Sequence, residues 1–420
     1  MDRESIAEEP GTVPPGPPVA ARPTTIVIHY GEVGIKGKNR PFFLGMLKRV
    51  LQRSIEGAPV RKLRSLPGRL LLECARPLSA DEEARVLERI GGVFGVAHFS
   101  VCAEVARDDL DGLEAAVVEL ASRMQTQRPR RSFRIVTHRS DKRFPITSVD
   151  LNVRLGQAVV DATGLCVDLK SPEMEVHVEV LQDRFLLYGD RRPGLDGLPV
   201  GSSGRLVALL SSGIDSPVAA YRLMGRGCRI FFVHFHSLPY TKRASLDLAE
   251  ELVRQLARHQ PSSRLYLVPL AEIQRKIVTE APAPLRVVLY RRYMLRLAAL
   301  VAKKVHARAL VTGESLAQVA SQTLDNLVAI EEAVDTPILR PLIGTSKGEI
   351  IAEARRLGTF DISIQPFDDC CSFLMPQSPE THAKLDQVLR AEERLGEMQP
   401  MLFDALARTE ELRIKLPPLS

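Results

Sequence analysis

Alternating apolar and polar blocks along the chain predict three successive folding units. In the first, strands are predicted at 24–30, 60–66, 69–73 and 95–101, and amphipathic helices at 41–55 and 80–90. This β-α-β-β-α-β order is typical of a ferredoxin-like unit. The second, from about Glu104 to Arg191, has helices at 110–124 and 147–163, a strand at 133–137 and a hairpin of 175–181 with 185–188.

From Arg205 onward, short apolar runs alternate with longer amphipathic segments. Strands are predicted at 229–235, 264–268 and 309–312, and helices at 242–258 and 286–306. Such alternation predicts an open, mostly parallel, doubly wound α/β sheet, in which ligands bind at the carboxyl ends of the strands. The end of the 205–210 strand, His234-Phe235 and the turn Thr312-Gly313-Glu314 all fall at such ends, so we expect them to line one crevice.

The stretch RLVALLSSGIDS, from Arg205 to Ser216, predicts a phosphate-binding loop. A continuously apolar run is followed by small hydroxylated residues, and Pro217 then opens an amphipathic helix. Backbone N–H groups and the helix dipole would both face an anion there. The chain has no G-x-x-x-x-G-K-[ST] motif. An ordinary strand–turn–helix with capping serines is the alternative.

Composition and charge narrow the functional classes. The chain has 420 residues, 45% hydrophobic and 26% charged, as in globular proteins, with a net charge of +6. No apolar run is long enough for a membrane span, and the Pro-rich first 23 residues lack a signal-peptide core, so we expect a cytoplasmic protein. Seven cations lie between Arg128 and Arg143 against the single acid Asp141. Such a cluster suits a polyanion, nucleic acid first, but taken alone a solvated basic face is the better explanation.

Six cysteines are present and none forms a C-x-x-C pair, so zinc and thioredoxin-like sites are not expected. Cys74, Cys102 and Cys228 lie in or beside apolar runs, which is typical of inert buried thiols. Cys370 and Cys371 are adjacent and follow two aspartates.

Eight blocks of the sequence, in this order, resemble the tRNA sulfurtransferase family, the tRNA 4-thiouridine synthetases. They are HYGEVGIKGKNRPFF, THRSDKRFPITS, GLDGLPVGSSGRLVALLSSGIDSPVAAYRLMGRG, VHFHSLPYT, YRRYMLRLAA, VTGESLAQVASQTLDNL, LRPLIGTSKGEII and FDDCCSF. SSGIDS within the third block resembles the SGGxDS signature of PP-loop ATP pyrophosphatases, with Ser212 at the first glycine. A serine is penalised there if the position needs a positive φ.

The resemblance implies a leader (1–23), a ferredoxin-like domain (24–85), a THUMP RNA-binding domain (86–191), a linker (192–204), a PP-loop domain (205–395) and a tail (396–420). Some members add a rhodanese domain with a persulfide-forming cysteine, for which this sequence leaves no room after Cys371. THUMP and ferredoxin-like domains imply a tRNA partner. A tRNA spanning two protomers would favour a homodimer.

The family reaction has two steps. ATP binds over the loop, O4 of a tRNA uridine (position eight) attacks the α-phosphate, and pyrophosphate leaves; a persulfide then delivers sulfur to C4 and AMP leaves. Adenylation calls for Mg²⁺ to neutralise the developing charge. We therefore expect ATP and Mg²⁺ as cofactors, with no protein cluster of metal ligands and Asp215 as the candidate carboxylate. A helix N-cap role for Asp215 is the alternative.

The matched motif positions assign the remaining site residues. The loop residues are Ser211, Ser212, Gly213 and Ser216, and the nucleotide contacts are Leu209, Leu210, His234, Phe235, Arg291, Gly313 and Gln322. Lys347 opposes the dipole of the helix that it opens, which hints at an anionic ligand. Cys370 matches the sulfur-transfer cysteine, although its acidic neighbours disfavour the thiolate that the chemistry needs.

RNA contacts are expected from two clusters. These are Lys36, Lys38 and Arg40, and Arg139, Lys142 and Arg143. Two other functions remain open: a PP-loop enzyme that uses ammonia or another nucleophile, and an RNA-binding protein whose nucleotide loop has decayed. Ser212, Ala317 (for a glycine) and Ser346 (for an acid) slightly favour decay. The presence of Asp215, Arg291, Gly313, Gln322 and Cys370 argues more strongly against it. The sulfur donor, a cysteine desulfurase in the family, is not readable from the sequence, nor is a carrier protein for thiazole synthesis.

Overall fold

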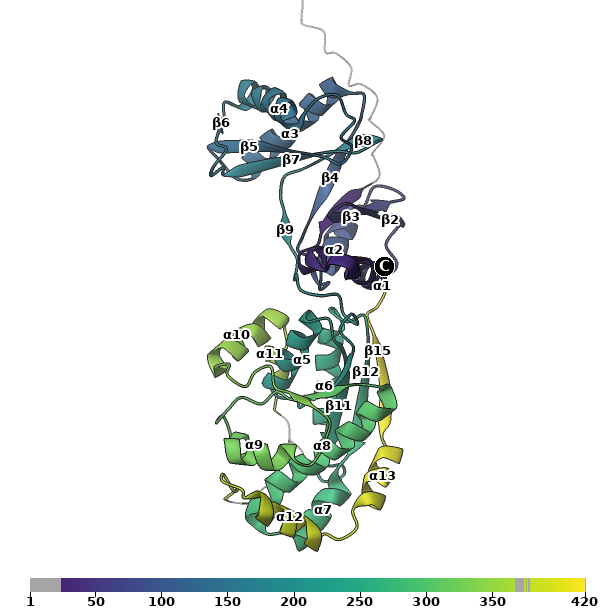
Figure 1. Cartoon of the computed structure of the whole chain (residues 1–420), viewed down its shortest axis with the longest axis vertical. Coiled ribbons are helices and arrows are strands. Elements are labelled where there is room, and N and C mark those ends of the chain that lie inside the picture. The colour runs from purple at the N-terminus through teal and green to yellow at the C-terminus, as the bar shows by residue number, and fades with distance from the viewer. Residues whose placement is uncertain (1–23, 367–373, 375, 377, 420) are drawn as a thin grey trace, which may run out of the picture.

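The computed structural model describes residues 24–366, 374, 376 and 378–419. The chain forms an elongated molecule, with two smaller units at one end and a large α/β domain at the other (Figure 1). The predicted leader (1–23) lies outside the described residues. Among the helices of the described part, none is long and apolar enough to cross a bilayer.

The first unit has the predicted β-α-β-β-α-β order. It consists of β1 (Thr25–His29), α1 (Arg40–Ser54), β2 (Val60–Leu66), β3 (Arg69–Cys74), α2 (Ala80–Gly91) and β4 (His98–Ala106). α2 starts at a capping box, in which the Ser79 hydroxyl accepts from the Glu82 N–H while the Glu82 carboxylate accepts from the Ser79 N–H. The apolar sides of α1 and α2 pack on the sheet.

The second unit continues the same sheet. It consists of α3 (Leu110–Gln127), β5 (Ser132–Arg139), α4 (Ser148–Thr163), β6 (Cys166–Val167), β7 (Met174–Val180) and β8 (Arg184–Tyr188). β4 is longer than predicted and is shared, since its residues 98–102 pair with β1 and its residues 103–106 pair with β8. The strand order is β2-β3-β1-β4-β8-β7-β5-β6. One strand therefore joins the two units.

Buried polar side chains fix the junction of these two units. Arg69 on β3 forms an ion pair with Glu179 on β7 at 2.8 Å, and both side chains are almost fully buried. His29 stacks on His98 with ring centroids 4.3 Å apart. Burial lowers the pKa of His29 to about 3, so this ring is neutral in the folded protein at neutral pH.

The predicted linker is ordered against both neighbours. Within it, β9 (Arg192–Pro193) pairs with β4, and Leu198 forms a bridge to Arg226 in the α/β domain. Arg226 also forms an ion pair with Glu32 of the first unit at 2.6 Å. The segment thus connects the α/β domain to the first unit by pairing with both.

The α/β domain alternates strands and helices as predicted, with additions at its end. It consists of β10 (Arg205–Leu209), α5 (Asp215–Gly225), β11 (Arg229–His236), α6 (Ala244–Leu256), β12 (Ser262–Pro269), α7 (Ala271–Glu280), α8 (Arg286–Val305), β13 (Ala309–Val311), α9 (Leu324–Glu331), β14 (Ile338–Leu339), α10 (Lys347–Leu357), α11 (Phe360–Ser363), α12 (Leu385–Arg394), α13 (Gln399–Ala407) and β15 (Glu410–Lys415). The sheet order is β14-β13-β10-β11-β12-β15, and β15 alone is antiparallel.

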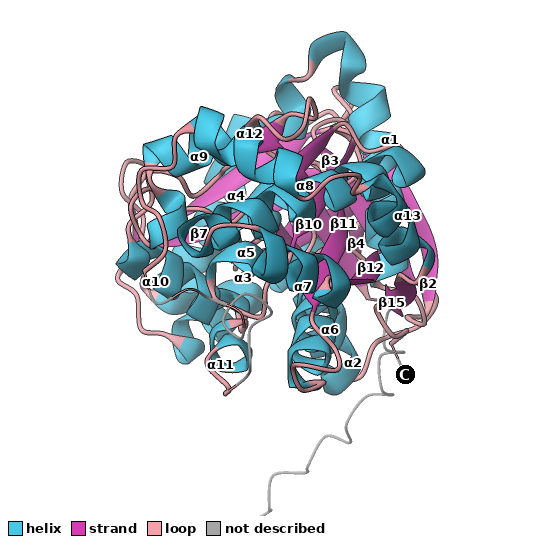
Figure 2. Ribbon diagram, turned by 90° about the horizontal axis from the view of Figure 1, so that it is seen from below, coloured by secondary structure: helices cyan, strands magenta, loops and turns pink. Residues whose placement is uncertain are grey.

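Helices cover both faces of this sheet, so its central strands are apolar on both sides (Figure 2). Val207, Phe231 and Val233 point into the core that contains α8, whereas Ala208 and Phe232 point into the core that contains α5 and α6. This explains why the run after Arg205 is continuously apolar rather than alternating. The fold class predicted from the sequence is confirmed.

Three local predictions differ from the structure. α5 begins at Asp215, two residues before Pro217, because the first turn of a helix leaves its N–H groups unpaired and tolerates proline. α7, α9, α11 and α12 were not predicted. Residues 396–420 were assigned to a tail, but within the described part they form α13 and the edge strand β15, which pairs with β12.

Candidate active site

A pocket opens at the carboxyl edge of the sheet of the α/β domain. Its volume is about 170 Å³. It is lined by Leu209, Leu210, Ser211, Asp215, Ser216, His234, Phe235, Arg291, Met294, Thr312, Gly313, Glu314 and Gln322. The three strand ends singled out in the sequence therefore converge, as expected from parallel strands. Of the residues assigned to the nucleotide, Ser212 and Gly213 do not line this pocket.

The loop after β10 is held by its own hydroxyl groups. The Ser211 N–H donates to the Ser216 hydroxyl at 2.9 Å, and the two serine hydroxyl oxygens lie 3.1 Å apart. The Gly213 N–H donates to the Ser211 hydroxyl at 3.3 Å. This network closes the turn from β10 to the first turn of α5, whose backbone N–H groups are suited to phosphate oxygens.

Ser212 does not need to be a glycine. Its backbone is not among the positive-φ positions of the described residues. The Ser212 hydroxyl is buried and donates to the Ser245 carbonyl at 3.1 Å. Ser212 thus ties the loop to the start of α6, and the expected conformational penalty does not arise.

Asp215 is bonded by two distant parts of the domain. The Lys347 ammonium lies 2.5 Å from its Oδ1, and the Gln318 side-chain amide donates to its Oδ2 at 2.8 Å. Lys347 is the first residue of α10, where its charge opposes the dipole, and Asp215 supplies the anion that offsets this. The carboxylate is therefore oriented by Lys347 and Gln318 rather than by capping α5.

Apolar walls and one amide form the opposite side of the pocket. The His234 ring Nδ1 lies 2.9 Å from the Leu210 carbonyl oxygen, and Phe235 is buried beside it. Gln322 is also buried, and its side-chain oxygen has no hydrogen-bond partner among the described residues. A buried acceptor of this kind in a pocket is suited to a donor on a ligand, such as an exocyclic amino group.

A chain of alternating charges, which sequence reasoning missed, holds Arg291 in the pocket. Glu314 is almost fully buried and forms ion pairs with Arg291 at 2.9 Å and with Arg340 at 2.7 Å. The Thr312 hydroxyl donates to the same carboxylate at 2.9 Å. The position of Glu314 after β13 was recognised in the sequence, but its partners lie 23 and 26 residues away and no local pattern links them.

Close backbone approach explains one glycine of the site. A Cβ on Gly313 would lie 2.7 Å from the Ser216 nitrogen, so a side chain there would push the turn after β13 away from α5. Ala317, in the same loop, has φ 60°, in the left-handed region that favours glycine. The loop nevertheless brings the side-chain amide of the neighbouring Gln318 within hydrogen-bond distance of the Asp215 carboxylate.

Cys370, with Cys371, lies outside the described residues. Cys74, Cys102 and Cys228 are buried, as predicted. Burial raises the pKa of the Cys74 thiol, as it does for the other two. These three are therefore poor nucleophiles.

The residues assigned to RNA binding differ in whether their side chains already form bonds within the protein. Lys38, Arg40 and Lys142 are exposed. Arg139 donates to the carbonyl oxygens of Phe144 and Ile146, at 2.9 and 3.0 Å, and so holds the loop after β5.

Two further members of these clusters have partners nearby. Lys36 lies 3.9 Å from Glu32, and Arg143 pairs with Asp141 at 3.0 Å while its side chain stays largely exposed. The hydrogen bonds from Arg143 lower the pKa of the Asp141 carboxyl group. The two clusters thus combine free cations with cations that stabilise loops.

In the described part of the chain, no three metal-ligating side chains come together. Of the two carboxylates that line the pocket, Glu314 is occupied by two guanidinium groups. Asp215 is the other, and its oxygens accept from Lys347 and Gln318, so a metal ion would share this carboxylate with them. One carboxylate is sufficient for Mg²⁺, which is commonly held by one or two carboxylates together with substrate phosphates. The residues present fit an ion that arrives with a nucleotide.

Comparison with known proteins identifies the same three units. Residues 25–100 match the family model of the ThiI ferredoxin-like domain, residues 107–190 that of the THUMP domain, and residues 201–396 that of thiamine biosynthesis protein (ThiI). A crystal structure of a 4-thiouridine synthetase–RNA complex with bound ATP is similar, with a TM-score of 0.85 and 30% identity over 94% of this chain and all of that one.

Curated relatives match along nearly their whole length. A probable tRNA sulfurtransferase of Thermus thermophilus is 47% identical over 390 residues, 92% of this chain and 93% of the relative. Another, of Moorella thermoacetica, is 39% identical over 393 residues, 93% of this chain and 98% of the relative. Together with the fold and the pocket, these matches show that the chain belongs to the tRNA sulfurtransferase family of enzymes.

Proposed function

We propose that this protein uses ATP to transfer sulfur to a uridine of tRNA, at position eight, and so forms 4-thiouridine. The observation that carries the proposal is the pocket at the carboxyl edge of the sheet, where the serine-rich loop, Arg291 and the Asp215–Lys347 pair converge. The solved relative that binds RNA and ATP has the same fold over 94% of this chain. The pocket and the RNA-binding units therefore belong to one reaction.

In the first step, O4 of the uridine attacks the α-phosphate of ATP and pyrophosphate leaves. Backbone N–H groups of the loop and of the first turn of α5, with the hydroxyl groups of Ser211 and Ser216, would hold the pyrophosphate. Arg291 would offset negative charge as it develops. Mg²⁺ bound with ATP, with Asp215 as its protein carboxylate, would neutralise phosphate charge.

In the second step, the outer sulfur of a persulfide attacks C4 of the adenylated uridine and AMP leaves. A second thiol then attacks the inner sulfur, which breaks the S–S bond, releases 4-thiouridine and leaves a disulfide between the two thiols. We assign the persulfide to Cys370 on its match to the family motif. A cysteine desulfurase or another persulfide donor would load it. Sulfur transfer to a carrier protein for thiazole synthesis would draw on the same persulfide. We further propose that the enzyme acts in the cytoplasm and that a tRNA engages two protomers of a homodimer.

One assay tests both steps. The full chain is incubated with ATP, Mg²⁺, unmodified tRNA transcript and a persulfide donor, and release of AMP and pyrophosphate is measured beside the absorbance of 4-thiouridine. We expect tRNA-dependent pyrophosphate release and the absorbance together. A tRNA transcript with its position-eight uridine replaced by cytidine is the matched substrate control and should give neither.

The variant Cys370→Ser separates the proposal from its rivals. We expect it to release pyrophosphate with tRNA but to form no 4-thiouridine, because only the thiol step is lost. Full product formation by this variant would favour an enzyme that uses ammonia or another nucleophile. If the wild-type chain binds tRNA but hydrolyses no ATP, the protein is an RNA-binding protein with a decayed loop.

A further inference from the structure

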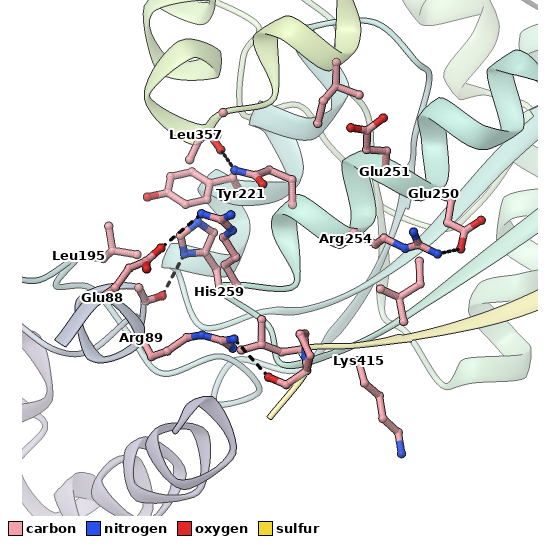
Figure 3. A pocket seen from close by; sticks show the side chains of 18 of the residues that line it. Glu88, Arg89, Leu195, Tyr221, Glu250, Glu251, Arg254, His259, Leu357 and Lys415 are labelled. Carbon is pink, nitrogen blue, oxygen red and sulfur yellow. Dashed lines mark hydrogen bonds and ion pairs between the residues drawn. The ribbon is translucent and has the colours of Figure 1, made fainter. Parts of the chain in front are cut away.

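A second and much larger groove lies at the opposite edge of the catalytic sheet from the pocket. Its volume is about 1100 Å³. Its walls are α2 of the ferredoxin-like unit and, from the α/β domain, the ends of α6, α10 and β15. Lys415 on β15 pairs with Ser262, the first residue of β12, which places this wall at the amino edge of the sheet. We call it the amino-edge groove (Figure 3).

The lining of the amino-edge groove is strongly basic. Eight of its residues are arginine or lysine and three are glutamate. The cations are Arg85, Arg89, Arg254, Arg258, Arg355, Arg356, Arg413 and Lys415. They come from both sides of a junction between two domains, so the charge is not the property of one helix surface.

Some of these cations have a local role. Arg254 pairs with Glu250 at 2.6 Å, Arg258 reaches Glu88 across the junction at 3.5 Å, and Arg355 lies over the Phe360 ring. Arg254 and Arg355 also lie in the last turns of α6 and α10, where a cation favours the helix dipole. Ion pairing, the contact with the Phe360 ring and the helix dipoles account for these three cations.

Three cations on facing walls are not accounted for in this way. The side chains of Arg85 and Lys415 are exposed and form no hydrogen bond or ion pair with another described residue. Arg89 donates through Nη2 to the Pro417 carbonyl at 3.2 Å, but its Nη1 is shielded from solvent and has no partner in the described part of the chain. Burial lowers the pKa of Arg89, a cost that a bound anion would offset.

The aromatic side chains of the groove are already occupied. Tyr221 is buried and packs edge-on against His259 with ring centroids 5.0 Å apart, and the His259 Nδ1 lies 2.9 Å from the Gly92 carbonyl oxygen. Both rings also pack against Phe94, with centroids 5.1 and 5.8 Å away, so they belong to one aromatic cluster. Flexible arginine and lysine side chains without a stacking platform are suited to phosphates, which position a nucleic acid without reading its sequence.

We propose that the amino-edge groove binds the phosphate backbone of the tRNA substrate, at a distance from the reacting uridine. This inference rests on the proposed function, since it takes tRNA as the anion. The groove borders both the ferredoxin-like unit and the catalytic domain, so a backbone held there contacts both at once. Its role is to position the RNA relative to the pocket.

Salt dependence of tRNA binding by the full chain tests the proposal. The variant Arg85→Gln with Lys415→Gln removes one cation from each wall without breaking a side-chain hydrogen bond or ion pair between described residues. Unmodified tRNA transcript is titrated at several salt concentrations. We expect weaker binding and a slope of log affinity against log salt that falls by about 2. Arg89→Gln alone should lower it by about 1.

The matched control removes the same charge elsewhere. Lys303 on α8 and Arg394 on α12 are exposed and lie outside the groove. Lys303→Gln with Arg394→Gln should keep the wild-type slope. An equal fall in the control would overturn the proposal, because it would show an effect of net charge alone. A wild-type slope in the groove variant would also overturn it, and would point to an acidic protein or a small anion as the occupant.

Two further measurements distinguish failure of the groove assignment from failure of the proposed function and from damage to the variant's fold. Thermal unfolding and ATP affinity are recorded for every variant, and an equal loss of ATP affinity in the groove variant would count against a specific RNA role. If the wild-type chain binds no tRNA, the proposed function fails. If it binds tRNA with a steep slope that the groove variant shares, only the groove assignment fails.

Discussion

Replacing Glu314 by glutamine should damage both the stability of the catalytic domain and its affinity for ATP. The Glu314 side chain is 5% exposed and neutralises Arg291 and Arg340, which are 28% and 13% exposed. Glutamine keeps the shape but leaves the Arg291 guanidinium without its anion and Arg340 with only the half-exposed Glu331. Breaking a buried ion pair by removing one partner costs about 3–5 kcal/mol. We take about 3 kcal/mol here, because Arg291 is partly hydrated.

This loss is measurable as a shift in melting temperature. For a domain of this size, about 3 kcal/mol corresponds to a fall in Tm of about 6–12 °C. Glu331→Gln is the matched control, since Glu331 also pairs with Arg340, at 2.8 Å, but is 50% exposed. An exposed pair contributes about 0.5 kcal/mol, so the control should melt about 1–2 °C below wild type.

ATP binding supplies the second readout of the Glu314→Gln variant. Without Glu314, Arg291 is no longer oriented toward the pocket, and loss of one charge-assisted hydrogen bond weakens binding by about tenfold or more. The Kd for ATP is measured by equilibrium titration below the melting range. A variant that melts with the control and binds ATP like wild type would refute the reasoning.

Three further predictions concern other parts of the chain. Ala317→Gly should raise Tm slightly, since relief of about 1–2 kcal/mol of left-handed strain exceeds the entropic cost of glycine of about 0.5–1 kcal/mol; a lower Tm would contradict this. The free energy of unfolding should fall as pH drops below about 6.5, because His29 takes up a proton in the unfolded chain but stays neutral in the folded one. His29 alone accounts for about 1.4 kcal/mol per pH unit down to about pH 3, and His29→Asn should reduce this pH dependence. Lys142→Gln should lower the salt slope of tRNA binding by about 1 at unchanged Tm, whereas Arg139→Gln should lower Tm by breaking two hydrogen bonds to backbone carbonyls.

Local patterns were sufficient to predict most of the fold. The strand through Val207 and Ala208 and the loop after it could be predicted, because an apolar run and a hydroxyl-rich turn are patterns of residues adjacent in the sequence. Lys347 was conspicuous for the same reason, since a cation at a helix start is locally unfavourable. Its partner Asp215 lies 132 positions earlier, and no local signal connects the two.

Long-range pairing is what the sequence did not predict. Glu314 looked like one acid in a turn, and only the approach of α8 and of the segment after β14 makes it the bridge between Arg291 and Arg340. Arg139 looked like part of a basic surface because composition does not distinguish a solvated guanidinium from one bonded to carbonyls. β15 was missed because an edge strand with one buried side chain, Ile414, has little hydrophobic signal.

The antiparallel edge strand has a consequence for how the protein is made. β15 is followed by residues that bond the first unit, where Leu419 N–H donates to the Glu56 carbonyl at 2.6 Å and Pro417 accepts from Arg89. These residues follow both units in the sequence, so the contacts between the ferredoxin-like and catalytic units that depend on them form only after both units have been synthesised. Ribosome-bound chains that still lack these residues would therefore have the two units in contact through the 192–204 segment and the Arg226–Glu32 pair, without the C-terminal contacts.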